Sequence, residues 1–172
     1  GGSVVFDLGP AGQYGPVAVS GGVATLERDL IAGGTHSVVA RYSGDQVNGT
    51  GASAGEPLTI TDAGTIVSVV VVTPNAPQYG SELSFTVTVE SQAGSTADPQ
   101  GSVRVTPDAG DAVTVALSPD GARDGRASIV VTIPAGLEPG AHAFAVAFLA
   151  DGGGYFAGSA LAAPVMKTVA LA

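Results

Sequence analysis

The stretch that decides the fold is Leu83–Glu90, which reads Leu-Ser-Phe-Thr-Val-Thr-Val-Glu. Apolar and polar residues alternate strictly along it, and successive side chains of a strand point to opposite faces. The same alternation recurs in residues 113–117 and 129–133. No stretch shows a convincing 3.6-residue period of the kind that marks an amphipathic helix. The pattern predicts an all-β chain whose strands bury one face.

Turn-forming residues separate these runs, among them Pro119-Asp120-Gly121 and Glu138-Pro139-Gly140. With these turns as boundaries, the sequence predicts a series of short strands in the second part of the chain. They span about residues 66–72, 81–90, 101–106, 111–117, 126–133, 141–149 and 159–171. Seven short strands in a segment of this length are typical of an immunoglobulin-like β-sandwich.

Three sequence blocks occur twice in the same order, which indicates two copies of one structural unit. The pairs are Gly2–Phe6 with Gly101–Val105, Gly22–Leu26 with Gly125–Ile129, and Ile31–Asp45 with Leu137–Asp151. The strands expected between residues 66 and 100 have no counterpart ahead of Gly1. We therefore expect two tandem immunoglobulin-like β-sandwiches. Residues 1–64 form a partial domain that lacks its first two strands, and residues 65–172 form a complete one.

Composition narrows the possible functions. The 172 residues are 45% hydrophobic but only 12% charged, with 26 Gly and 11 Pro, against roughly 25% charged in an ordinary domain. Fifteen acidic and six basic residues give a net charge of −9, which argues against binding to nucleic acid or anionic lipid. No apolar run is long enough to insert into a membrane as a helix. The chain has no Cys, so thiolate catalysis, zinc–thiolate sites and disulfides are excluded.

Several short motifs are found along the chain: Thr73-Pro74, Pro77–Gly80, Gly2–Phe6, Gly22–Leu26, Gly34–His36 and Ala40–Asp45. Together they resemble the bacterial immunoglobulin-like repeats that occur in tandem in large surface proteins and adhesins. The second unit departs from the pattern, with Ala141 in place of Thr and Leu149-Ala150-Asp151 in place of Ser-Gly-Asp. The resemblance implies a sandwich fold on a bacterial cell surface. It implies no catalytic residues and no cofactor, so we do not expect an enzyme.

Two histidines, His36 and His142, invite a catalytic reading. They occupy the same place in the two repeats, at the start of a strand and in phase with its core-facing residues. Catalysis would also need a nucleophile and an orienting partner. A residue that recurs in every module usually belongs to the scaffold. We expect both histidines to be structural.

A few acidic residues raise the alternative of calcium binding. Asp45 in the first unit and Asp151 in the second follow corresponding strands. At that position an Asx-type turn is the simpler interpretation. No loop shows the dense series of Asp and Asn with a closing Glu that a high-affinity calcium site uses. The calcium candidates are Asp45, Asp151, Asp120 and Asp124.

Two surfaces are predicted to contact other protein. In the second unit, the outward positions of strand 141–149 are all alanine, and a sheet face that is apolar on both sides indicates burial against another domain or subunit. In the first unit, core residues would lack the cover of the first two strands. The predicted interaction residues are Ala143, Ala145 and Ala147, and Val4, Phe6 and Leu26, together with Val38 and Tyr42.

Three functions remain open at this point. The first is a structural extracellular module that serves as a stalk, spacer or adhesive segment of a bacterial surface protein. The second is a subunit of an extracellular fibre whose incomplete first domain is completed by strands from a neighbouring chain. The third is an accessory module that binds glycan or calcium. The expected partners are neighbouring immunoglobulin-like domains or identical subunits, and a cell-surface ligand is a further possibility.

Overall fold

The computed structural model describes residues 1–28, 31–92, 95–118 and 121–171. The all-β prediction is confirmed: the described elements are antiparallel strands and one 3₁₀ turn, η1 (Gly9–Ala11). Within these residues, no helix has the length and apolar character needed to cross a membrane. The chain divides into two compact units, Gly1–Asp62 (unit 1) and Ala63–Ala172 (unit 2). The division lies two residues before the boundary expected from the sequence.

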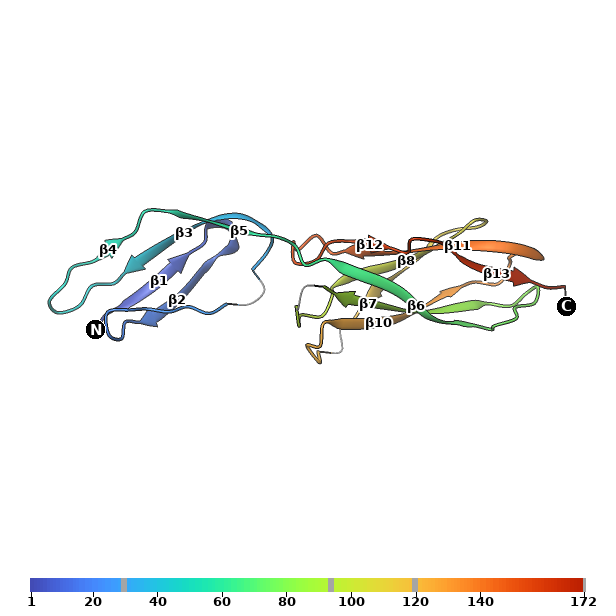
Figure 1. Cartoon of the computed structure of the whole chain (residues 1–172), viewed down its shortest axis with the longest axis horizontal. Coiled ribbons are helices and arrows are strands. Elements are labelled where there is room, and N and C mark those ends of the chain that lie inside the picture. The colour runs from blue at the N-terminus through green and yellow to red at the C-terminus, as the bar shows by residue number, and fades with distance from the viewer. Residues whose placement is uncertain (29–30, 93–94, 119–120, 172) are drawn as a thin grey trace. The chain divides into compact units, whose positions relative to one another are not determined.

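Unit 1 contains a single antiparallel sheet, in which β2, β1 and β3 lie side by side (Figure 1). Both β4 and β5 pair with β3, one after the other along the edge that β1 does not use. The strands are β1 (Ser3–Asp7), β2 (Gln13–Ala18), β3 (Gly34–Tyr42), β4 (Gly51–Ala52) and β5 (Glu56–Ile60).

The prediction that unit 1 holds the last five strands of a sandwich is wrong for Gly22–Leu26. Residues 22–28 are described but form no strand, and the nearest pairing is an isolated bridge between Ser20 and Val23. The matching segment of unit 2 is a strand because a neighbouring strand supplies its hydrogen-bond ladder. Residues 1–62 contain no sequence counterpart of that neighbour. An alternating pattern forms a strand only where a second strand pairs with it.

Unit 2 contains two antiparallel sheets. One has the order β10-β7-β6, and the other has the order β9-β8-β11 with β12 and β13 both paired to the outer edge of β11. The last expected strand, 159–171, is broken in two, and Pro164 stands at the break, where it cannot donate to a ladder. The strands are β6 (Thr65–Thr73), β7 (Leu83–Ser91), β8 (Gly101–Pro107), β9 (Val113–Leu117), β10 (Arg126–Ile133), β11 (Gly140–Ala150), β12 (Ser159–Ala160) and β13 (Val165–Val169).

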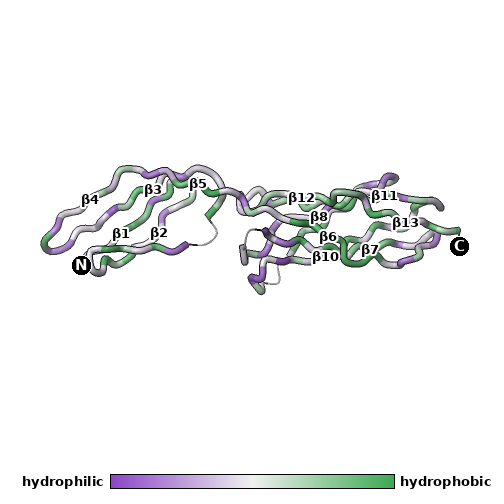
Figure 2. The backbone as a smooth tube through the Cα atoms, in the orientation of Figure 1, coloured by the Kyte–Doolittle hydropathy of each residue, from purple (hydrophilic) through white to green (hydrophobic). Residues whose placement is uncertain are grey.

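The core of unit 2 lies between its two sheets, as in a β-sandwich. The alternation that defines β7 is borne out, because its four apolar side chains are at most 1% exposed. From the opposite sheet, Phe144 meets Phe85 of β7 with ring centroids 5.0 Å apart and planes inclined by 51°. Figure 2 shows hydrophobic segments along the strands of both units. The residues of this core include Leu83, Phe85, Val87, Val89, Val103, Val105, Val131, Phe144, Val146 and Phe148.

Candidate functional site

The main candidate site is one face of the sheet of unit 1, which we call the open face. Its residues share a side of the sheet because Val4 pairs with Tyr42 and Phe6 with Ala40 across β1 and β3. All four residues are half-buried, as is Val38 two positions further along β3. A hollow of ≈ 520 Å³ lies against this face; Val4 and Tyr42 line it, together with Val19, Gly22, Ala24, Asp45 and Asn48. Leu26, also predicted here, is half-buried in the unpaired segment 22–28.

The matching face of unit 2 shows what full cover does to such residues. Val103 and Val105 of β8 are 0% exposed, and Phe148 of β11 is 1% exposed. They are the sequence counterparts of Val4, Phe6 and Tyr42, respectively. The sheet formed by β10, β7 and β6 covers them. The open face therefore carries the side chains of a core surface without comparable burial.

Beside the hollow, Asp45 holds a tight turn. Its carboxylate accepts hydrogen bonds from the backbone N–H groups of Val47 (2.9 Å) and Asn48 (2.7 Å) and from the Tyr42 hydroxyl (2.9 Å). These donors, the two backbone groups first, lower the pKa of Asp45 well below its usual range. Burial raises the pKa of Tyr42 first, and then the hydrogen bond to the Asp45 carboxylate and the negative charge of Asp45 raise it further. The carboxylate acts as a turn acceptor, as the Asx-type interpretation predicts.

Two of the other calcium candidates, Asp151 and Asp124, are turn acceptors as well. Asp151 accepts a hydrogen bond from Gly153 N at 3.0 Å, and Asp124 accepts one from Arg126 N at 3.0 Å, each within its own turn. Asp120 lies outside the described residues. Across the described part of the chain, no group of three His, Cys, Asp or Glu residues is placed to hold a metal ion.

The two histidines make the same contact in both units. His36 Nε2 lies 2.8 Å from the carbonyl oxygen of Ala32, and His142 Nε2 lies 2.7 Å from that of Glu138, four residues earlier in each case. Both residues are buried, at 7% and 8% exposed. This shared contact supports the structural interpretation.

Unit 2 adds an ion pair that the sequence did not reveal. Asp108 Oδ1 lies 2.9 Å from His142 Nδ1, and Asp108 Oδ2 accepts a hydrogen bond from Ala143 N at 3.1 Å. The Glu138 carbonyl and then the Asp108 carboxylate raise the pKa of His142, and His142 first lowers that of Asp108. The contact ties the end of β8 to the start of β11.

The alanines predicted as an interface lie on the outward side of β11. Ala143 and Ala147 are half-buried and Ala145 is exposed. Their cross-strand neighbours are Met166 beside Ala143 and Arg104 beside Ala147. The face thus carries small side chains together with one methionine and one arginine. Its contact with another protein stays a prediction.

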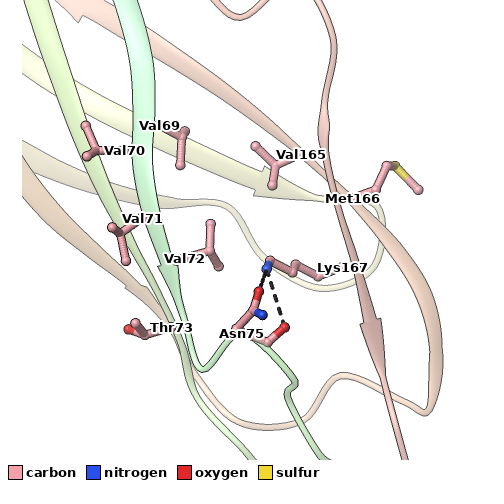
Figure 3. Close-up of a pocket in the computed structure, with 9 residues that line it drawn as sticks. All are labelled: Val69, Val70, Val71, Val72, Thr73, Asn75, Val165, Met166 and Lys167. Carbon is pink, nitrogen blue, oxygen red and sulfur yellow. Dashed lines mark hydrogen bonds between the residues drawn. The ribbon is translucent and has the colours of Figure 1, made fainter.

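A shallow groove of ≈ 580 Å³ separates β6 from β13 in unit 2. Val72 of β6 and Val165 of β13 lie between the two strands, and Met166 points away from β6 (Figure 3). At one end, Lys167 Nζ donates a hydrogen bond to Asn75 Oδ1 over 2.9 Å. The sequence did not predict this groove. The groove forms because β6 and β13, the first and last strands of unit 2 in the sequence, lie near each other in the fold.

Comparison with known proteins adds nothing to this picture. No family model, no curated protein and no solved structure matches the chain.

Proposed function

We propose that this chain is a structural module of an extracellular surface protein, made of two tandem immunoglobulin-like repeats that act as a spacer or adhesive segment and carry no catalytic site. The extracellular location rests on the resemblance of the motifs alone. The repeat itself is supported by the register of the strands.

Residues at corresponding positions of the two repeats pair in the same way within each unit. Val4 faces Tyr42 across β1 and β3, and their sequence counterparts Val103 and Phe148 face each other across β8 and β11. The agreement extends to the edge of the sheet, where Gly34↔Ile60 and Arg41↔Ala52 correspond to Gly140↔Val169 and Ala147↔Ala160. A repeat in sequence that is also a repeat in register supports two copies of one module. This is the observation that carries the proposal.

The ends of unit 2 are tied in a way that suits a module under tension. Parallel bridges join Ala63 to Phe156 and Gln78 to Ala170. The second bridge includes hydrogen bonds of 2.8 Å from Tyr79 N to Ala170 O and 2.9 Å from Ala170 N to Pro77 O. Force applied to the two ends of unit 2 would load the hydrogen bonds of these isolated bridges, which must break before the unit extends. A spacer under load gains from this arrangement.

Single-molecule force spectroscopy tests the proposal. The chain, held between flanking handles, should give one sharp unfolding peak for unit 2. The released length is about 390 Å for roughly 110 residues at ~3.5 Å each, less the folded end-to-end distance. Ala170→Pro removes one hydrogen bond of the second bridge and should lower the peak force, whereas Ala170→Gly keeps the N–H and is the matched control. A smooth extension without a peak would contradict a load-bearing role.

A further inference from the structure

The inference concerns the open face of unit 1 and rests on the proposed repeat. In unit 1 a sheet face lacks cover, and a segment beside it lacks a pairing partner. Core-type side chains on β1 and β3 are only half-buried, and segment 22–28 forms no ladder. In unit 2 one strand completes both corresponding features. This strand, β7, covers Val103 and Val105 and pairs along its whole length with β10.

We propose that the open face is a docking site for an antiparallel pair of β-strands with the chemistry of β6 and β7, supplied by a polypeptide segment outside residues 1–172. The inner strand of the pair would carry alternating Leu, Phe and Val side chains against Val4, Phe6 and Tyr42, as β7 does in unit 2. Its free edge would pair with segment 22–28, as β7 pairs with β10. The outer strand would protect the remaining edge.

The hollow on the open face fits this occupant. It measures ≈ 520 Å³, and its lining includes Val4 of β1, Tyr42 of β3 and Ala24 of the unpaired segment. An inserted strand would fill that space with alternate side chains. Its backbone would satisfy the exposed groups of the segment, which is how an extended peptide binds to an incomplete sheet.

A second copy of this chain fits less well. Its β6 and β7 are already committed to its own core, where Leu83, Phe85 and Val87 are at most 1% exposed. Two open faces packed against each other would cover apolar side chains but would leave segment 22–28 without a ladder. Only a strand pair that is not yet part of a folded unit satisfies both features.

The test uses the chain's own strands as the probe. Residues 63–99 are duplicated and fused ahead of Gly1, so that the copy meets unit 1 as the original meets Gly101. The fused protein should stay monomeric in analytical ultracentrifugation and gain a second cooperative thermal transition. Amide exchange in β1 and β3 should slow by at least about tenfold relative to residues 1–172. The matched control carries Phe85→Asp in the added copy only, where a buried charge prevents docking, and should behave like the unfused chain.

Three outcomes overturn the proposal. The fused copy leaves amide exchange in β1 and β3 unchanged, or the Phe85→Asp control protects them equally. Alternatively, residues 1–172 form a dimer that Phe6→Asp abolishes, which makes a second copy the occupant. None of these results affects the force peak of unit 2, so failure of this inference is distinguishable from failure of the proposed function.

Discussion

Replacing Phe85 with Ala tests whether the two sheets of unit 2 form one shared core. The side chain is 0% exposed and contacts Phe144 of the opposite sheet at 5.0 Å between ring centroids. Truncation of a buried Phe to Ala costs about 3–5 kcal/mol through lost burial and the cavity it leaves. The total free energy of unfolding for a unit of this size is on the order of 5–15 kcal/mol. The variant should therefore lose about a fifth or more of its stability.

Calorimetry of the full chain measures this loss. With an unfolding entropy of about 2.1 cal/mol/K per residue, ~4 kcal/mol corresponds to a fall of roughly 15–20 °C in the Tm of unit 2. The matched control is Val130→Ala on β10, whose side chain is 53% exposed; it should change stability by no more than about 0.5 kcal/mol. A loss below about 1 kcal/mol for Phe85→Ala would refute the packing of the two sheets.

Three further predictions concern other parts of the chain. The raised pKa of His142 means that the folded state binds a proton more tightly than the unfolded chain, whose histidine has its ordinary value of 6.5. Its stabilising effect should be complete below about pH 6.5 and disappear as the pH rises through the folded pKa; His142→Gln should remove this slope from Tm measured between pH 5 and pH 9, Asp108→Asn should reduce it because the Glu138 carbonyl remains, and an unchanged slope in Asp108→Asn counts against the ion pair. Gly101→Ala should destabilise unit 2 by more than about 1 kcal/mol in urea unfolding, because Gly101 has φ +148° and a Cβ would collide with a carbonyl oxygen of β11; a neutral result would mean that the close approach is wrong. Residues 63–172 expressed alone should unfold cooperatively on heating and residues 1–62 should not, and a cooperative transition in the shorter fragment would disprove the incompleteness of unit 1.

The strands of unit 2 were predictable because each is marked locally. Alternation identified β7, and the turn residues that flank it set its limits to within two residues. The repeat then located β1 and β3 of unit 1. Local pattern is sufficient where every strand finds a neighbour in the same unit.

Pattern failed where a feature depends on distant residues. The alternation of Gly22–Leu26 resembles that of β10, yet only β10 has a strand to pair with. The ion pair of Asp108 and His142 joins residues 34 positions apart. Asp98, which is 8% exposed, accepts a hydrogen bond from Gly125 N at 3.3 Å, although nothing in its local sequence marks it. Such contacts are set by the packing of the sheets and not by the nearest neighbours in the chain.

The central claim is that each unit contains its own copy of the same sheet, and that only the copy in unit 2 is covered by a second sheet. Amide hydrogen exchange across the full chain tests this claim most directly. Because β8 and β11 lie in the closed core of unit 2, their amides should exchange only through global unfolding of that unit. The equally paired amides of β1 and β3 should exchange at least about 100-fold faster, through local opening of an uncovered sheet. Equal protection of the two pairs of strands would contradict the account.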